Sequence, residues 1–441
     1  MKNKSLINLF WPIFFETLFL MLAGSVDTLM LSSLNDNAVG AVGTANTYLS
    51  LFIIMFSIIS TGMVAVMTQY IGAGLPYIAK RAKNLGIVLN GSLGIILSLT
   101  LGVLSKEILI TIGVAKSILE YATVYMTIVG GASIITALIP IYSNYLRSFG
   151  YTKITMYANI IANICNLLLN SIFLFVFKMG VTGIAIATVI SKIVNLIILM
   201  FFSNKKIYFE NDELINSAKQ IPTSQIFKQI LRIGLPAATE TALYNLSMAL
   251  IIRFLNQMDS EGINITARSF VVTITNLSFC AGLALAQANA ITIGWNIGQH
   301  KFEKSYKDTF KALKYGLIIC ISISILFVIF SNPILSLFID NSKIKALAYK
   351  LLIIDIFLEI GRIMNLVFAN ALKTAGDAFY IVVVASIVML IIGVGGTYFL
   401  GIHLKYMAVG AYIAMALDEL IRGIISILRW ISKKWQEKAL I

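Results

Sequence analysis

The chain has 441 residues, of which 59% are hydrophobic and 12% are charged. Water-soluble domains are about 45–50% apolar and about 25% charged. A chain of this length with so few charges cannot cover its surface with water-compatible side chains, so the composition excludes an ordinary soluble protein and indicates one whose main solvent is lipid.

Apolar runs long enough to cross a bilayer follow one another along the whole chain. A spanning helix needs roughly 20 such residues, and a membrane β-barrel would instead show short alternating segments. The pattern therefore predicts an all-α polytopic membrane protein. We expect about twelve spans, at roughly 6–33, 38–72, 84–105, 117–146, 154–177, 182–203, 228–256, 264–298, 311–331, 345–372, 378–401 and 406–429.

The net charge of +14 is concentrated in alternate loops. Basic loops remain on the cytoplasmic side of a membrane, so we expect both termini in the cytoplasm and the chain in the cell (inner) membrane. The same placement indicates contact with membrane lipids and no nucleic-acid partner. The basic positions are Lys80, Arg81 and Lys83; Arg147 and Lys153; Lys205 and Lys206; Lys301, Lys304, Lys307, Lys311 and Lys314; and Lys433, Lys434 and Lys438.

The first span carries two acids, Glu16 and Asp27. They are eleven residues apart, which is about 20° around a helix, so both point the same way. Acids at membrane depth usually face a cavity or a partner and mark an ion or substrate path. Asp27 is therefore a candidate for ion coupling and Glu16 a further cavity candidate, the alternative being that one of them reaches an interface.

Neutral oxygen donors follow on the fifth and sixth spans. Asn166 and Asn170 are four residues apart and share one helix face, and Thr188 lies among small residues on the sixth span. An acid among such oxygens suits Na⁺ or a bound proton, although amides and hydroxyls also hold membrane helices together. Lys192, on the same sixth span, has no partner that the sequence identifies.

The two halves of the chain repeat each other. Pro12 and Glu16 recur as Pro236 and Glu240, and the segment 144–150 recurs at 370–376, at spacings of about 224–227 residues. Six spans per half give both halves one orientation, related by a pseudo-two-fold axis along the membrane normal. We expect an amino-terminal six-helix lobe at 1–203, a cytoplasmic linker at 204–225 and a carboxy-terminal six-helix lobe at 226–441.

The second half also carries charges at membrane depth. Glu240 stands on the seventh span, while Asp355, Glu359 and Arg362 line one face of the tenth. They form a candidate ion or substrate site, and the alternative is a structural network in which Arg362 neutralises the acids. Five further charges lie nearer the ends of predicted spans and are interpreted as orientation or interface anchors: Arg253, Arg268, Asp418, Glu419 and Arg422.

The sequence lacks the residues that several kinds of enzymatic chemistry require. No Gly-x-x-x-x-Gly-Lys-Ser/Thr phosphate loop occurs, and the two histidines, His300 and His403, lie near loops. The three cysteines fall inside apolar runs, where they read as small buried residues. We therefore expect no enzyme, no cofactor and no metal beyond Na⁺ as a coupling ion, with H⁺ as the other candidate.

Short motifs in order along the chain resemble those of the multidrug and toxic compound extrusion (MATE) family. The resemblance covers nearly the whole chain and is closer to the NorM-type than to the DinF-type branch. The motifs are Ser25-Val26-Asp27-Thr28-Leu29-Met30, Ala45-Asn46, Gln69 to Gly74, Gly234-Leu235-Pro236, Gly294 to Gly298 and Leu372 to Asp377.

The resemblance implies two six-helix lobes and export of cationic or amphipathic compounds against Na⁺ or H⁺. It also implies an amino-lobe ion site, whose positions here are Asp27, Asn166, Asn170 and Thr188. Two features depart from the family. Asn170 stands where DinF-type members have an aspartate. In the carboxy-lobe site of NorM-type members, the seventh-helix acid follows the proline by two turns, whereas Glu240 follows Pro236 by one, and Arg362 occupies the tenth-helix acid position.

The sequence thus predicts a monomeric secondary antiporter that exports small organic compounds by alternating access. A lipid-linked oligosaccharide flippase of the same superfamily is the alternative, and it would favour further spans and a strongly basic cavity. A membrane-embedded enzyme would need an Asp-rich metal motif or a deep His–acid pair. A passive channel would show unitary currents in a planar bilayer.

Overall fold

A computed structural model describes residues 4–207, 209, 220–337 and 339–441, without the side chains of Ser25 and Asp36. All regular secondary structure in these residues is helical, which confirms the all-α prediction. The acidic part of the predicted linker, Glu210 to Glu213, lies outside the described residues. The chain forms two compact units, Phe15–Gly234 and Met1–Phe14 with Leu235–Ile441. The lobe boundaries at 203 and 226 remain predictions.

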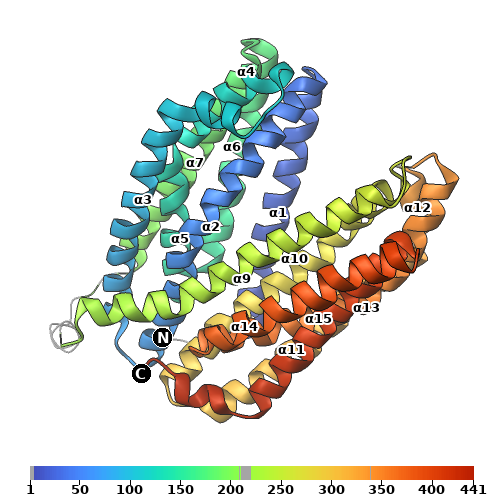
Figure 1. Cartoon of the computed structure of the whole chain (residues 1–441). Helices are drawn as coiled ribbons and strands as arrows, with labels where there is room; N and C mark the ends of the chain where they lie inside the picture. Colours follow the sequence, from blue (N-terminus) through green and yellow to red (C-terminus); the bar gives the residue numbers. More distant parts are fainter. Residues whose placement is uncertain (1–3, 208, 210–219, 338) are drawn as a thin grey trace. The chain divides into compact units, whose positions relative to one another are not determined.

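The unit Phe15–Gly234 is a bundle of helices that pack against one another along their lengths (Figure 1). The helix α1 begins in the other unit and continues into this one, and α9 does the reverse. The segments η1 and η2 are π-helical turns, a feature that occurs frequently at functional sites. The elements are α1 (Leu6–Ser32), α2 (Asp36–Gly72), α3 (Pro76–Thr111), α4 (Lys116–Tyr125), η1 (Met126–Gly130), α5 (Ser133–Ser148), α6 (Thr152–Ser171), η2 (Ile172–Val176) and α7 (Gly180–Lys206).

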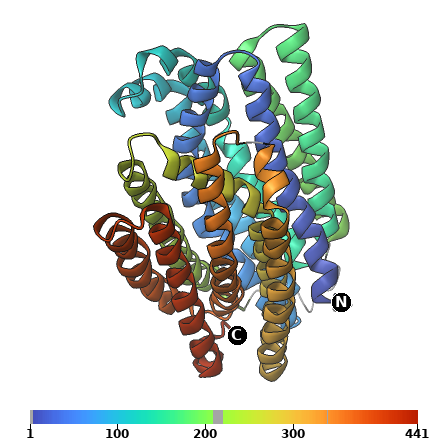
Figure 2. The same cartoon turned by 90° about the vertical axis from the view of Figure 1, so that its right-hand side faces the viewer.

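The second unit is built in the same manner, with α13 packed between α10 and α15 (Figures 1 and 2). Its segments η3 and η4 are π-helical and continue α14, and η5 is a 3₁₀ turn near the carboxy terminus. The elements are α9 (Thr223–Gln257), α10 (Ile263–Gly298), α11 (Phe302–Ile329), α12 (Ser331–Ser336), α13 (Ser342–Thr374), α14 (Ala378–Val388), η3 (Met389–Gly395), η4 (Thr397–His403), α15 (Met407–Ile431) and η5 (Lys434–Lys438).

Within the described residues, eight helices are long and apolar enough to cross a membrane. A ninth candidate is the pair Lys116–Gly130 and Ser133–Ser148, which is bent by 47°. The helices α9, α13 and α15 are as long but carry more charge, including Glu240, Glu359 and Arg422. With these three, the helical segments coincide with the twelve predicted runs.

Local sequence explains where several helices begin. The side chain of Asn35 accepts a hydrogen bond from the backbone N–H of Ala38 and caps α2. Asn341 caps α13 in the same way through the N–H groups of Lys343 and Ile344. Pro76 occupies the first turn of α3, where its missing N–H costs nothing. These residues determine the positions at which α2, α3 and α13 begin.

Two glycines allow α2 and the first turns of α9 to touch at backbone distance. A Cβ atom at Gly62 would lie 2.1 Å from the carbonyl oxygen of Ile230, and one at Gly234 would lie 1.7 Å from that of Ile58. Small residues permit such close approach between membrane helices. The crossing therefore depends on both positions being glycine.

The buried cores of the two units are built from corresponding residues. Ala41 and Ala122 belong to one core cluster, while Ala267 and Ala348 belong to the other. Ala267 follows Ala41 by 226 residues, and Ala348 follows Ala122 by the same spacing. The predicted duplication is thus present in the packing as well as in the motifs.

Candidate functional site

The predicted amino-lobe residues meet where α1 packs against α6. The side-chain amide of Asn170 donates a hydrogen bond to Asp27 Oδ1 at 2.7 Å and a second one to Asn166 Oδ1 at 3.2 Å. Asn170 is fully buried and Asp27 is half-buried. The helical spacing of Asn166 and Asn170 places both amides on the face of α6 that meets α1. The carboxylate therefore lies among neutral polar groups.

Thr188 approaches the same place from α7, and two further residues complete the surroundings. The hydroxyl of Tyr125 interacts with the side chains of Asn46 and Thr188, and it lies within electrostatic range of Asp27. Thr188 donates its own proton to the carbonyl of Ile184 at 2.9 Å, so its oxygen acts as an acceptor toward the site. We call Asp27, Asn166, Asn170, Thr188, Tyr125 and Asn46 the amino-lobe site.

Asp27 differs from most other acids of the spans in having no basic neighbour. Among the described residues, no Lys, Arg or His nitrogen lies within 4.0 Å of its carboxylate, whereas Glu16, Glu240 and Glu359 each form an ion pair. A carboxylate removed from water without a counter-charge binds a proton or a cation more readily. The surroundings of Asp27 therefore suit reversible neutralisation of its carboxylate by a proton or a cation.

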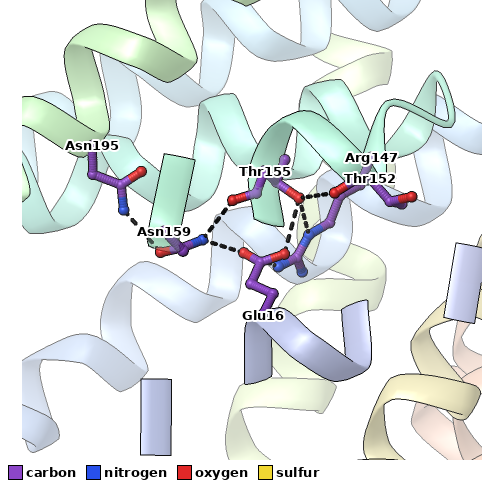
Figure 3. Close-up of polar contacts among 6 residues, drawn as sticks. All are labelled: Glu16, Arg147, Thr152, Thr155, Asn159 and Asn195. Atoms are coloured by element: carbon purple, nitrogen blue, oxygen red, sulfur yellow. Dashed lines mark hydrogen bonds and ion pairs between the residues drawn. The ribbon is translucent and has the colours of Figure 1, made fainter. Parts of the chain in front are cut away.

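Glu16 is also brought to the α1–α6 contact, but in a different environment (Figure 3). Its side chain is 1% exposed and forms an ion pair with Arg147 at 2.6 Å. Thr155 donates to Glu16 Oε2 at 2.9 Å and Asn159 donates to Glu16 Oε1, while Asn195 on α7 donates to Asn159 at 2.9 Å. Glu16, predicted as a cavity candidate, is enclosed by partners in this structure.

The second half reproduces this ion pair. Glu240 on α9 lies 2.6 Å from Lys373 at the end of α13. Glu16 and Glu240 are 224 residues apart, and Arg147 and Lys373 are 226 residues apart. Each unit thus joins the first helix of its repeat to the last turn of the fourth one through an acid and a base.

The three predicted residues on α13 lie together beside a cavity of about 110 Å³. Arg362 forms an ion pair with Glu359, which also accepts a hydrogen bond from Ser278 at 2.8 Å. Asp355 is 2% exposed, and its Oδ2 atom has no hydrogen-bond partner in the structure. The cavity is lined by Tyr244, Met248, Arg268, Val272, Thr275, Asn276, Phe279, Asp355, Leu358, Arg362, Tyr412 and Met415.

The size of this cavity limits its contents. Binding sites for drug-sized molecules are about 300–1,000 Å³, and one water takes about 30 Å³. A volume of about 110 Å³ accommodates an ion with a few waters. In this conformation the residues Asp355 and Arg268 therefore face a space for small polar species.

Three of the five charges interpreted as orientation or interface anchors, those on α15, are instead buried. Arg422 is 3% exposed and pairs with Asp418 at 2.5 Å and with Glu419 at 3.0 Å. Asn365 on α13 donates to Glu419 at 3.0 Å. The interpretation was wrong because α15 presents these residues to α13, where Gly361 and Gly423 let the two helices approach closely. Proximity to a predicted span end did not reveal this burial.

Sequence reasoning also left out several residues of these networks. Tyr125 was not selected because a tyrosine in an apolar run resembles a packing residue. Asn46 appeared only within a motif. Lys192, which had no identified partner, donates to Thr136 at 3.1 Å. The internal repeat was the one signal that could have predicted Arg147 and Lys373 as partners, since it aligns both the acids and the bases.

Fold and site together define a multi-pass helical membrane transporter with buried ionisable groups in both of its units. The family model MatE matches residues 12–172 and 236–399 of the chain. The chain therefore belongs to the MATE family, whose members include multidrug transporters, and it is an efflux transporter of that class.

Relatives support this assignment over the full length. The uncharacterized transporter YisQ of Bacillus subtilis is 35% identical over 445 residues, covering 100% of this chain and 96% of the relative. The probable multidrug resistance protein NorM of Thermotoga maritima is 23% identical, with 100% and 94% covered. A crystal structure of the MATE transporter VcmN of Vibrio cholerae shares the fold with a TM-score of 0.89, 20% identity, and 99% and 97% coverage.

Proposed function

We propose that this protein is a secondary antiporter that exports small organic compounds, cationic or amphipathic, in exchange for Na⁺ or H⁺ by alternating access. The observation that supports it is the carboxylate of Asp27, which lies among the amides of α6 without a basic partner in the described structure. Efflux against a concentration gradient needs a free-energy source, and the transmembrane gradient of an ion that neutralises this carboxylate would supply it.

Coupling requires that the ion binds one conformation more tightly than the other. A ligand shifts a conformational equilibrium only by its differential affinity for the two states. Asp27 on α1 and Asn170 on α6 are joined at 2.7 Å. Neutralising the carboxylate weakens this charge-assisted hydrogen bond, so ion binding would change how α1 packs on α6. That change is the step through which the ion would favour release of the exported compound.

The donors around Asp27 suit either coupling ion. For H⁺, the protonated carboxyl would donate to the free Oδ1 atom of Asn170, which has no partner in the structure. For Na⁺, which prefers oxygen ligands, the oxygens of Asp27, Asn166 and Thr188 would provide the first ligands, and Asn170 would contribute its oxygen if its amide turned over. The two mechanisms use the same residues.

The carboxy-lobe residues would form a second ion site. Asp355 has an unpartnered oxygen facing a cavity that suits a hydrated ion better than a drug-sized compound. Glu359 and Arg362 would position it as a fixed pair, while Glu240 is held by Lys373. We also propose that the protein acts as a monomer in the cell membrane with both termini in the cytoplasm.

Efflux of a fluorescent organic cation from proteoliposomes under an imposed Na⁺ gradient, and then under an imposed pH gradient, tests this function. An antiporter predicts that one gradient accelerates efflux and the other does not, with no unitary currents in a planar bilayer. Efflux that is insensitive to both gradients, measured with protein whose folding is verified, would contradict ion coupling.

A further inference from the structure

A second cavity, of about 330 Å³, lies in the unit formed by Met1–Phe14 and Leu235–Ile441, away from the acids described above. It is formed where the beginning of the chain meets the end of α10 and the first turns of α11. The lining residues are Lys4, Ser5, Leu6, Ile7, Asn289, Thr292, Trp295, Asn296, Lys304, Asp308, Lys311 and Tyr315. Its volume is within the range of sites for small organic ligands.

One polar side chain in this lining is buried and unsatisfied. Asn289 is 0% exposed, and neither its Nδ2 nor its Oδ1 atom has a hydrogen-bond partner in the structure. Buried amides are nearly always hydrogen-bonded, because an unpaired group loses its interactions with water. Since Asn289 lines the cavity, a ligand or ordered water in the cavity would supply the missing partners.

The charge of the lining favours an anion. Lys4, Lys304 and Lys311 contribute three positive charges, against the single acid Asp308. Asp308 is already engaged, because Asn296 donates to it at 3.2 Å and Lys311 lies 3.7 Å from it. The cavity therefore presents excess positive charge to whatever occupies it.

A row of lysines runs beside the cavity on α11. Lys304, Lys307, Lys311 and Lys314 follow one another at intervals of three, four and three residues, which places them along one face of the helix. Basic residues at the cytoplasmic end of membrane helices attract anionic lipid, and basic pockets between such helices bind anionic headgroups. Only Lys304 and Lys311 of this row line the cavity.

Apolar groups adjoin the polar lining. Ile7 is 48% exposed and Tyr315 is 41% exposed, and Leu6 lies next to Ile7. Exposed apolar side chains beside a basic pocket suit a molecule with a charged head and a hydrocarbon tail. A fully water-soluble anion would leave this apolar rim without a partner.

We propose that this cavity binds a phosphate group carried by an acidic phospholipid. The phosphate would lie against Lys304 and Lys311, the amide of Asn289 would bond to the headgroup oxygens, and the acyl chains would pass over Ile7 and Tyr315. The site is a lipid-binding site in the second unit and does not depend on which ion drives transport.

The test uses the purified full-length protein in a neutral detergent, with phosphatidylglycerol added at increasing concentration and the apparent melting temperature measured. Phosphatidylcholine with the same acyl chains controls for the tail, and glycerol 3-phosphate for the soluble headgroup. Phosphatidylglycerol is expected to raise the melting temperature well above the effect of either control. Equal effects of the two lipids would overturn the proposal, and an equal effect of glycerol 3-phosphate would overturn the lipid assignment.

Matched variants distinguish lipid binding in the cavity from a general attraction of the lipid to the positive charge of α11. The double variant Lys304→Gln/Lys311→Gln is expected to weaken the response to phosphatidylglycerol by roughly fivefold for each lysine removed. The variant Lys307→Gln/Lys314→Gln removes the same charge from the same helix outside the cavity and is expected to retain most of the response. If both double variants lose the response equally, the lipid recognises only the net charge of α11 and the site proposal is wrong.

A third variant tests the buried amide without changing charge. Asn289→Leu is expected to fold, because it replaces an unsatisfied polar group with an apolar one of similar volume, and to lose part of the response to phosphatidylglycerol. A stabilised Asn289→Leu protein that responds as fully as the wild type would show that the cavity holds only water near this residue, and would overturn the proposed headgroup contact.

Discussion

Glu16 and Arg147 form an ion pair at 2.6 Å inside one unit, and Glu240 and Lys373 form an ion pair at 2.6 Å at the corresponding positions of the other. Each pair joins residues more than 130 positions apart in the chain. The acid follows a proline by one helical turn in both repeats, and the base precedes a short connection that contains a glycine with positive φ, Gly150 or Gly376. The duplication has thus preserved an interaction and not only a hydrophobic pattern.

Breaking the first of these pairs on one side should destabilise the protein strongly. Arg147→Met leaves Glu16 charged, 1% exposed and without its base, and removing one partner of a buried ion pair typically costs about 3–5 kcal/mol. We expect a clear fall in the apparent melting temperature in detergent. Lys153→Met, which removes an exposed cation from the nearby α6, is the control and should change little.

The double variant Glu16→Gln/Arg147→Met distinguishes the contribution of the ion pair to stability from that of the other contacts of Arg147. It removes both charges, so it should recover most of the stability that Arg147→Met loses. A double variant as unstable as the single one would show that the arginine stabilises the unit through contacts other than the ion pair.

The amide of Asn170 should tune the affinity for the coupling ion. It donates to Asp27 at 2.7 Å, and hydrogen bonds to charged groups contribute about 1.5–3 kcal/mol. Asn170→Leu should therefore change the ion concentration for half-maximal efflux by at least about tenfold, measured in proteoliposomes. Asn163→Leu removes an amide of the same helix that donates to the carbonyl of Phe19. Unchanged ion dependence in Asn170→Leu, or an equal shift in both variants, would contradict a specific role.

The glycine at the α2–α9 crossing should not tolerate a methyl group. Gly62→Ala would place Cβ 2.1 Å from the carbonyl oxygen of Ile230, so the two helices must separate, and such overpacking typically costs about 1–3 kcal/mol. Gly43→Ala, also on α2, has no atom within 4 Å of the added group and should be neutral or slightly stabilising. Thermal unfolding of the two variants side by side measures the difference.

A loop carboxylate outside the spans should make stability depend on acid pH. Partial burial alone would raise the pKa of Asp259, but hydrogen bonds from the backbone and side chain of Asn264 and from the N–H of Ile263 outweigh it, so the pKa lies below its ordinary value. A folded-state pKa below the unfolded one means that this stabilisation is present above about pH 4. It is lost as the pH falls through the folded-state pKa.

Asp259→Asn should consequently lower the melting temperature at neutral pH and flatten its decline on acidification. Asp340→Asn, at another loop position in the same unit, should leave the pH profile as in the wild type. If Asp259→Asn and the wild type lose stability in parallel below pH 5, the contribution of this carboxylate is absent.

The helical fold and the duplication can be predicted from the sequence, because both depend on short local patterns that are recognisable without the structure. Apolar runs of the right length identify spans, and motifs such as Pro12-x-x-x-Glu16 and Pro236-x-x-x-Glu240 identify equivalent helices. The faces of α1 and α6 that carry Asp27 and Asn170 also follow from helical spacing. Their contact at 2.7 Å agrees with that expectation.

The partners of each charge could not be predicted in the same way, since they depend on how helices distant in sequence pack. Glu16 and Asp27 point in similar directions from α1, yet Glu16 forms an ion pair with Arg147, whereas Asp27 accepts a hydrogen bond from the neutral amide of Asn170. Arg422 lies near a span end in the sequence, but it is buried because α13 and α15 pack through Gly361 and Gly423. The partners of a buried charge depend on how two helices are placed against each other. The periodicity of a single helix in the sequence does not give that placement.

The most direct test of the account compares the wild type with Asp27→Asn and Glu120→Gln in substrate-loaded proteoliposomes under the gradient that drives efflux. Glu120→Gln makes the corresponding change at an exposed acid on α4. The account predicts that gradient-driven efflux in Asp27→Asn falls to the level of protein-free liposomes, while Glu120→Gln transports like the wild type. Gradient-driven efflux at the wild-type rate in Asp27→Asn would contradict a coupling role for this carboxylate.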